Sequence, residues 1–439
     1  MSNKLLNLIL FLFISVLSSF SQVNIKADNG CFEKFAPWGD GFLGVVETQT
    51  IAVIPKYRKF QYFDKSGKLI WDTKVDPYNF SGGSIWNEES NYSYYLNFPF
   101  DKVALTGKTS KEDFLNIYRL DNKGKLESKT IKFTDKLSSL NEKISELTVS
   151  YYCATKNHLL VVIQKGDSKF YIIKIDEDFS YDVSEFDIKW DKNLYNKVQL
   201  GLPKFYTNNN EFFCIQPSLL NSTIKFDVQS IDFENFSEIN KSEFNVNFEG
   251  YNLSSKNQLI EANNTFDNTL LSYSIVTSKG NTTYYSPSLS QYFNIKFDQK
   301  GEMYILSYYS NEINKTVNDG YLVFKKSNQD EDLDPILDLK FKNIEKFKSE
   351  NHLYFNNEND YILGFQVDKK TSSVLSSTGK TKTYNTINIV EMMNNYLLKD
   401  KFSLDEEINN VFINNNSIRG FKYSGKPNAL YHFGKVIVY

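Results

Sequence analysis

Hydrophobic and polar residues alternate with a period of two along much of the chain. Ile224, Phe226 and Val228, for example, alternate with a lysine, an aspartate and a glutamine. A β-strand turns successive side chains toward opposite faces of a sheet, so this alternation predicts strands with one packed face and one polar face. Valine, isoleucine, phenylalanine, tyrosine and threonine dominate these segments, whereas glycine, asparagine, aspartate and serine dominate the gaps. That division predicts an all-β protein with polar turns.

A polar turn between two such segments recurs along the chain. Its best copy is the sequence FQYFDKSGKLIW, which begins at Phe60 and turns through Asp64 and Gly67. A second copy turns through Asp121 and Gly124. Five more degenerate copies turn near Asp176, Asp232, Thr277, Lys326 and Met393, which gives steps of 57, 55, 56, 45, 49 and 67 residues. The spacing indicates an internal repeat.

Most copies of the repeat also have an apolar run upstream of the turn. These runs are Gly41 to Val46, Tyr92 to Phe98, Leu159 to Gln164, Phe212 to Gln216, Met303 to Tyr308 and Tyr361 to Val367. Each unit is therefore predicted to hold three or four antiparallel strands. The segment from Ile389 to Leu397 fits a short helix, and it also fits a hairpin that turns at Met392 to Asn395.

Four-stranded repeats of about this length are typical of β-propellers, whose sheets pack around a ring. The apolar strand, Asp-x-x-Gly turn and second strand with tryptophan resemble the repeat of the pyrroloquinoline-quinone-like propellers, and Asp64, Gly67 and Trp71 carry this resemblance. It implies the fold and not the cofactor, because the quinone enzymes of that family carry an adjacent cysteine pair that this chain lacks. We expect a single all-β propeller of about seven four-stranded blades over residues 22–439. Six or eight blades, or two β-sandwich domains, are the alternatives.

The C-terminal sequence ALYHFGKVIVY, from Ala429 to Tyr439, has a strong strand pattern and no turn after it. Such a strand would leave an unpaired apolar edge. We therefore expect it to pair with N-terminal strands and close the ring.

The N-terminus resembles an export leader. Lys4 precedes a mostly apolar run from Leu5 to Leu17. This run spans roughly 20 Å as a helix, which is short of the ~30 Å hydrocarbon core of a membrane. Small residues at Ser19 and Ser21 favour cleavage before Gln22. Residues 1–21 are thus a predicted signal peptide, and we expect an extracytoplasmic protein, periplasmic or secreted, without a membrane span.

Composition places the chain among globular proteins, with 41% hydrophobic and 23% charged residues. Its 50 basic and 53 acidic residues leave a formal charge of −3. This balance provides no general attraction for nucleic acid, so we expect no nucleic-acid partner.

The three cysteines are Cys31, Cys153 and Cys214. They are too few and too far apart for a disulfide framework or for a zinc site with paired ligands. A bridge between Cys153 and Cys214 stays open. Their aromatic neighbours favour buried thiols instead.

Motifs for catalysis or metal binding are scarce. The histidines His158, His352 and His432 are isolated from other metal-type ligands in the sequence. The acidic segment Asp330 to Asp334 alternates as in a calcium loop, but Pro335 occupies the position that requires glycine. We therefore expect no metal and no cofactor, and the catalytic residues, if the protein is an enzyme, are unknown.

Only three arginines occur, Arg58, Arg119 and Arg419. Arg58 and Arg119 lie near equivalent positions of the repeat, which favours a structural role for both. A site that binds a carboxylate through three arginines would need all three of them.

Longer loops, Asp76 to Asn91 and Lys192 to Asn210, are predicted between repeats, and loops commonly carry function. They hold Trp86, Tyr195 and Tyr206, which either bind a partner or pack beneath the loops. The favoured hypothesis is a non-enzymatic binding or scaffolding module that contacts a protein or a glycan at one ring face. The alternative is a propeller-fold hydrolase or lyase of extracellular polysaccharide, whose carboxylates the sequence does not locate. The oligomeric state is left open.

Overall fold

A computed structural model describes the chain from Val23 to Val438 with gaps, and every regular element in the described part is a β-strand. The described residues are 23–48, 57–75, 82–99, 114–132, 147–166, 169–188, 203–207, 210–220, 223–246, 248–249, 271–277, 280–286, 293–297, 303–311, 318–326, 334–341, 346–355, 361–369, 384–392, 398–404, 410–414, 417–427 and 433–438. The all-β prediction is confirmed. The predicted signal peptide, residues 1–21, lies outside the described residues.

Sheets 2, 3 and 4 are antiparallel meanders of four strands each, and sheet 1 is a four-stranded meander within a larger eight-stranded sheet. Sheet 1 consists of β2 (Cys31–Trp38), β3 (Gly41–Glu47), β4 (Arg58–Phe63) and β5 (Leu69–Val75). Sheet 2 consists of β6 (Gly82–Trp86), β7 (Tyr92–Asn97), β8 (Phe114–Asp121) and β9 (Leu126–Lys132). Sheet 3 consists of β10 (Leu147–Ala154), β11 (Leu159–Lys165), β12 (Lys169–Ile175) and β13 (Tyr181–Asp187). Sheet 4 consists of β14 (Lys204–Thr207), β15 (Glu211–Leu220), β16 (Thr223–Asp232) and β17 (Ile239–Val246).

The next three sheets continue the pattern in chain order. Sheet 5 contains β18 (Phe248–Glu249), β19 (Leu271–Thr277) and β20 (Gly280–Ser286). Sheet 6 contains β21 (Phe293–Phe297), β22 (Met303–Asn311), β23 (Asn318–Lys326) and β24 (Asp334–Phe341). Sheet 7 contains β25 (Lys346–Phe355), β26 (Tyr361–Lys369), β27 (Tyr384–Met392) and β28 (Leu398–Leu404). This succession of mostly four-stranded sheets is a β-propeller.

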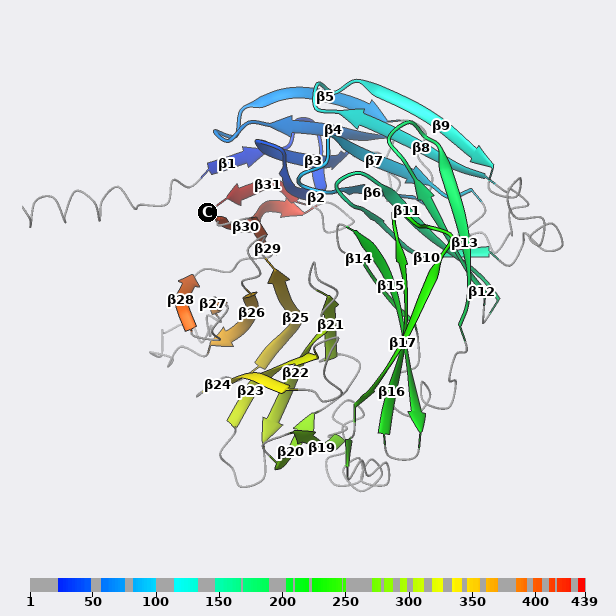
Figure 1. The fold of residues 1–439 in the computed structure, drawn as a ribbon. Helices are drawn as coiled ribbons and strands as arrows, with labels where there is room; N and C mark the ends of the chain where they lie inside the picture. The colour runs from blue at the N-terminus through cyan, green and yellow to red at the C-terminus, as the bar shows by residue number, and fades with distance from the viewer. Residues whose placement is uncertain are drawn as a thin grey trace, which may run out of the picture.

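A closing sheet joins the two ends of the chain. Its strands are β29 (Asn410–Asn414), β30 (Ser417–Pro427), β31 (Phe433–Val438) and β1 (Val23–Lys26). Strand β31 pairs with β1 along four residues and with β2 at a single pair, Phe32 with Phe433. The expectation that the C-terminal strand pairs with N-terminal strands is confirmed. Figure 1 shows the sheets following one another in chain order until the red C-terminal strands reach the blue N-terminal ones.

Packing identifies β1 as the outermost strand of the closing sheet. In sheet 2, the turn glycine Gly124 rests on Trp71 of β5, the last strand of the preceding sheet, where an added Cβ would lie 2.8 Å from Trp71 Cδ2. In sheet 1, the equivalent Gly67 rests on Val23 of β1, where an added Cβ would lie 2.7 Å from Val23 Cγ1. Both glycines have a positive φ, 81° at Gly67 and 78° at Gly124, which other residues rarely adopt. The described strands form seven hydrogen-bonded sheets, and one of these combines the closing strands from both chain ends with β2–β5.

The turns and strands predicted from the alternating pattern lie where the sequence placed them. All seven predicted turn positions lie at the connection between the last two strands of sheets 1–7. The six predicted upstream runs are β3, β7, β11, β15, β22 and β26. The helix considered near Ile389 is wrong, because β27 and β28 pair there as a hairpin.

Two predicted loops are partly strands. Strand β6 lies within the expected loop Asp76 to Asn91, and β14 lies within Lys192 to Asn210. Both strands are short, and β6 has the sequence GGSIW, which carries little alternation. Pairing with β7 and β15, rather than their own sequence, holds them in strand conformation.

The first strand of each sheet lies on the inner side of the arrangement. In Figure 1 the strands of sheets 1 and 2 step inward from β5 and β9 to β2 and β6. Strand β6 contacts β10, and β14 contacts β21, so first strands of different sheets lie near one another. Burial follows the same order, because β3 is buried along its whole length whereas β9 is mostly exposed.

The hydrophobic core consists of layers between successive sheets. The layer between the closing sheet and sheet 1 includes Ile25, Phe35, Phe42, Phe421 and Val436. Similar layers lie between sheets 1 and 2, between sheets 2 and 3 and between sheets 3 and 4. Sheets 1, 2 and 3 therefore bury side chains on both faces, and this burial is the main source of stability.

Candidate functional site

Polar side chains connect the sheets at their turn side. Trp71 Nε1 donates a hydrogen bond to the carbonyl of Asn122 at 3.1 Å. Arg119 donates to the carbonyl of Glu177, and Lys174 Nζ donates to that of Phe233 at 3.0 Å. Each acceptor directly follows the turn aspartate of the next sheet. We call these three contacts the turn latches, and they repeat with the blades.

Arg58 and Arg119 do not occupy equivalent positions, which corrects the reading from the sequence. Arg58 begins β4, whereas Arg119 lies two residues before the turn aspartate Asp121 at the end of β8. Lys174, two residues before Asp176, is the true counterpart of Arg119. The sequence already separates the two arginines when they are counted from the turn aspartates, because Arg58 lies six residues before Asp64 and Arg119 only two before Asp121.

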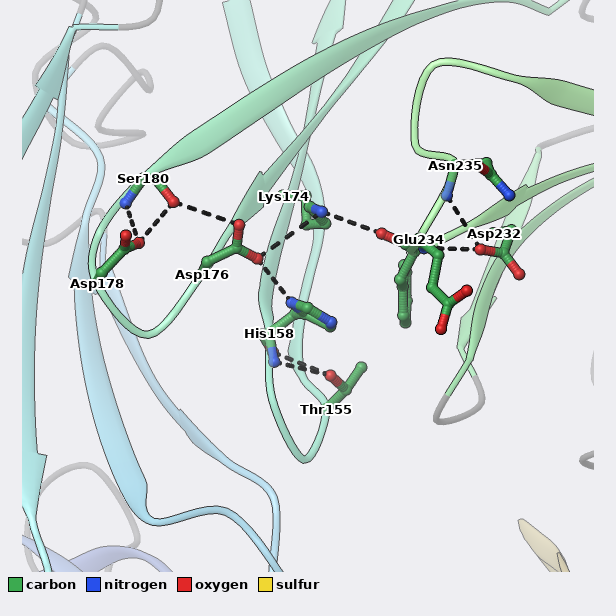
Figure 2. Close-up of polar contacts among 10 residues, drawn as sticks. Thr155, His158, Lys174, Asp176, Asp178, Ser180, Asp232, Glu234 and Asn235 are labelled. Carbon is green, nitrogen blue, oxygen red and sulfur yellow. Dashed lines mark hydrogen bonds and ion pairs between the residues drawn. The ribbon is translucent and has the colours of Figure 1, made fainter.

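A network around His158 surrounds one turn latch, as Figure 2 shows. His158 Nδ1 lies 2.8 Å from Asp176 Oδ1, and Lys174 Nζ lies 3.8 Å from the same oxygen. Ser180 Oγ donates to the other carboxylate oxygen of Asp176 at 3.3 Å. The His158 ring packs edge-on against Phe233, with centroids 5.2 Å apart. We call these five residues the histidine network.

The sequence showed His158 as isolated because its partner lies on another strand connection. His158 is in the β10–β11 turn and Asp176 is in the β12–β13 turn, which an antiparallel meander places at the same end of the sheet. The signal in the sequence that could have revealed this partner was the repeat itself, because Asp176 is one of its turn aspartates. His352 lies in β25 and His432 lies outside the described residues. Within the described part of the chain, no three His, Cys, Asp or Glu side chains form a potential metal site.

A second polar group lies between sheets 1 and 2, toward the strand ends opposite the turns. Arg58 Nε bonds Glu33 Oε2 at 2.7 Å, and Arg58 Nη2 lies 3.0 Å from Glu47 Oε1. Arg58 Nη1 donates to the Tyr95 hydroxyl at 2.9 Å. We call Glu33, Glu47, Arg58 and Tyr95 the arginine cluster. Although burial disfavours the charged form, the surrounding Glu33, Tyr95 and Glu47 raise the pKa of Arg58.

A β-bulge in β2 brings Glu33 into this cluster. Phe32 pairs with Val46 and Lys34 pairs with Val45, so Glu33 is the extra residue between them. A bulge changes the direction in which a side chain points. Here it turns both Glu33 and its neighbour Lys34 toward sheet 2, although successive strand residues normally face opposite ways.

Lys34 and Tyr152 lie beside the arginine cluster on either side of β6. Lys34 Nζ donates to the carbonyl of Ser84 at 3.0 Å and lies 4.4 Å from the Trp86 ring centroid. Burial lowers the pKa of Lys34 to about 8, against the opposing effect of Glu33. The Tyr152 hydroxyl lies against Gly83, at a place that any larger residue would fill. Burial, followed by the charge of Glu33, raises the pKa of Tyr152.

The aromatic residues proposed from the sequence are distributed over separate sheets. Trp86 ends β6, is buried, and donates from Nε1 to the carbonyl of Pro37 at 3.0 Å. Tyr206 lies half-buried in β14, where it pairs with Phe213. Tyr195 lies outside the described residues. Partner binding by these three residues stays a prediction.

All three cysteines are buried and none is in a disulfide. Cys153 and Cys214 both belong to the hydrophobic layer between sheets 3 and 4. Burial raises the pKa of Cys153 to about 11, so its thiol is protonated at neutral pH. The expectation of buried, unbridged thiols is confirmed.

No protein-family model matches this chain, and no curated protein matches it. Among solved structures, it is similar to the β-propeller domain of the Trilobed protease from Pyrococcus furiosus, with 10% identity, a TM-score of 0.34, and coverage of 82% of this chain and 93% of that chain. It is also similar to the Vanderwaltozyma polyspora Nup133 β-propeller domain, with 8% identity, a TM-score of 0.38 and coverage of 92% and 99%. Drosophila Plexin A, solved in complex with Semaphorin 1b, shows 9% identity, a TM-score of 0.34 and coverage of 95% and 86%.

A structure of prolyl endopeptidases also matches, with 10% identity, a TM-score of 0.30 and coverage of 77% of this chain, which spans 47% of that chain. These likenesses concern the fold and leave the pyrroloquinoline-quinone-like repeat unassigned. The described residues contain no helix that is long and apolar enough to span a membrane.

Proposed function

We propose that the protein is an extracytoplasmic binding or scaffolding module that engages a protein or a glycan through one face of the propeller. The observation that carries this proposal is the use of buried cations in the junctions between sheets. Arg58, Arg119 and Lys174 each reach from one sheet to the next and bond there. Such contacts favour a rigid ring that presents its loops, which is the architecture of a scaffold.

The same observation disfavours the hydrolase or lyase alternative. A polysaccharide hydrolase typically needs one carboxyl group that donates a proton and a second that acts as base or nucleophile. Among the residues that the structure describes, Glu33 and Glu47 lie together near the inner strands, and both are held by the guanidinium of Arg58. Their geometry fits a structural ion pair with Arg58 better than a catalytic pair in which one carboxyl group donates a proton and the other acts as base or nucleophile.

The export leader, residues 1–21, supports a periplasmic or secreted location at the cell envelope. N-terminal sequencing of the exported protein tests this location. A mature N-terminus near Gln22 supports it, and a retained Met1 in the cytoplasm contradicts it.

Binding and catalysis can be separated on one preparation. A glycan array and an assay of reducing-sugar release use the same purified protein and the same polysaccharides. Saturable binding to a partner without sugar release supports the binding module. Turnover that disappears after Glu33→Gln or Glu47→Gln, in variants that still fold, would establish the enzyme instead.

A further inference from the structure

We propose that Asn29 and Gly30 form a site of spontaneous covalent modification, at which the asparagine is converted to isoaspartate and the closure of the ring is weakened. The pair lies in the connection between β1 and β2, which carries the N-terminal strand of the closing sheet. It is the only Asn-Gly sequence in the chain. The inference concerns the lifetime of the closed ring and does not depend on the proposed binding function.

The reaction needs the two residues and water. The main-chain nitrogen of Gly30 attacks the side-chain carbonyl carbon of Asn29, and the new C–N bond closes a cyclic imide. The side-chain nitrogen of Asn29 leaves as ammonia, together with the proton that the attacking nitrogen loses. Water then opens the imide at one of its two carbonyl groups, which gives either aspartate or isoaspartate. Glycine favours the attack because it has no side chain to obstruct the approach of its nitrogen.

Both reacting groups are accessible in the structure. Asn29 is exposed, and Gly30 is only partly buried. Within the described part of the chain, neither the Asn29 carboxamide nor the Gly30 main-chain amide makes a hydrogen bond to another residue. An amide in a strand ladder would first have to break its hydrogen bond, which costs free energy. The Gly30 nitrogen does not carry this cost.

The packing of the connection explains why the chain contains this reactive pair. Asn29 has a φ of 56°, in the left-handed region that asparagine adopts more readily than most residues. A Cβ at position 30 would lie 2.4 Å from the Glu47 carbonyl oxygen and 2.5 Å from Val46 Cγ1, so a larger residue would clash there. The connection therefore requires glycine at position 30 and favours asparagine before it.

Hydrogen bonds on both sides of β1 make the connection sensitive to its length. Ala27 N donates to the Gly434 carbonyl of β31 at 3.0 Å. Asp28 and the buried Gln61 exchange two hydrogen bonds of 3.1 Å each. Isoaspartate at position 29 adds a methylene group to the main chain beside these contacts, and it adds a negative charge next to Asp28. We therefore expect the contacts to weaken and β1 to pair less firmly with β31.

Incubation of the full protein at neutral pH, followed by peptide mass spectrometry, tests the modification. Asn122 and Asn235 are internal controls, because both are exposed residues in turns and neither is followed by glycine. We expect Asn29 to be modified at least about tenfold faster than either control. Labelling with a protein isoaspartyl methyltransferase should identify isoaspartate as the main product at Asn29.

The effect on ring closure is measured by calorimetry after ion exchange, which separates the modified protein by its added negative charge. The modified fraction should melt about 1–3 °C below the unmodified one, because it loses one or two hydrogen bonds of the connection. Asn29→Gly is the control variant, since glycine tolerates the positive φ and lacks the carboxamide. Its melting temperature should not change on incubation.

Three outcomes overturn the proposal. They are modification of Asn29 no faster than that of Asn122 and Asn235, equal melting temperatures of the modified and unmodified fractions, and an equal fall in melting temperature when Asn29→Gly is incubated. The last result would place the cause of the weakening elsewhere in the chain. If Asn29→Gly fails to fold, the comparison of the two fractions of the unaltered protein decides.

Discussion

The two faces of sheet 1 are formed by the same strands, yet they differ in chemistry. Toward the closing sheet, Phe35 packs on Phe42 and Phe421 with ring centroids 5.6 and 5.5 Å apart. Toward sheet 2, the same strands present Trp38 and the arginine cluster. Period-two alternation assigns the apolar face, whereas the Glu33 bulge creates part of the polar one. We call these the phenylalanine face and the arginine face.

The difference shows that the two faces are stabilised in different ways. Packing between aromatic rings requires no specific polar partner, and its contribution to stability depends on the apolar area that is buried. A buried guanidinium with two carboxylates is stable only while each charge keeps its partner. Lys34, which follows the bulge, also lies at the arginine face and donates to the Ser84 carbonyl.

Removal of the closing strand should have the largest effect on the phenylalanine face. Deletion of Val436–Tyr439 removes the C-terminal half of β31, which joins β1 to β30. Loss of its two buried valines alone costs about 3–6 kcal/mol. The melting temperature should fall sharply, as calorimetry would measure. An unchanged melting curve would show that the ring does not depend on this strand.

Phe35→Ala should destabilise the phenylalanine face without pH dependence. Phe35 is 1% exposed and contacts four other phenylalanine rings. The cavity should cost about 3–5 kcal/mol in urea unfolding. Because no titratable group is removed, the loss should be equal at pH 5 and pH 8. A loss that varies across this range would contradict the comparison.

Arg58→Met should destabilise the arginine face by a similar amount, about 3–5 kcal/mol, but with pH dependence. It leaves Glu33 and Glu47 partly or fully buried without their cation, which costs stability while both carboxylates are charged. Protonation then relieves the penalty, so the loss should be largest at pH 8 and smaller at pH 5. Urea unfolding at both pH values measures it.

The triple variant Arg58→Met, Glu33→Gln and Glu47→Gln is the control for Arg58→Met. It removes the uncompensated charges and should recover part of the lost stability. If it is less stable than Arg58→Met at pH 8, the charge explanation is wrong.

The contrast between the two faces also explains what the sequence revealed about the fold. Alternating residues and turn aspartates such as Asp64 and Asp121 located most strands, because these signals are local. Strands β6 and β14 lack the signal, and β1 joins its sheet only through a partner 400 residues away in the chain. Pairing with neighbouring strands in space therefore determines these strands, and the local sequence pattern does not.

The candidate site was less accessible from the sequence than the fold. Glu33, Glu47, Arg58 and Tyr95 come from four strands, and a bulge without a sequence signature orients Glu33. His158 and Asp176 meet only because two turns lie at one sheet end. Trp86 was noticed as a large aromatic residue, but its burial under Lys34 depends on the packing of two sheets.

Lys174→Met should have a smaller effect than either face variant. It removes a turn latch that bonds the Phe233 carbonyl and leaves that acceptor without this donor. Loss of a buried, charged hydrogen bond costs about 1–3 kcal/mol. Lys169→Met, in the same strand but exposed and paired with Glu185, is the matched control and should be nearly neutral. Equal losses in both variants would show that the latch adds no stability.

Glu127→Gln should have the smallest effect, and only above acidic pH. Hydrogen bonds from Arg119 and then Lys125 lower the pKa of Glu127 to about 2. A carboxyl group with a lowered pKa stabilises the fold above its ordinary pKa near 4.5, and this contribution is lost as pH falls toward 2. Urea unfolding of both proteins at pH 7 and pH 2.5 should show a small difference that shrinks at the lower pH. Because Glu127 is exposed and the arginine face is buried, a difference as large as that of Arg58→Met would remove the distinction between surface and interior charges on which the comparison rests.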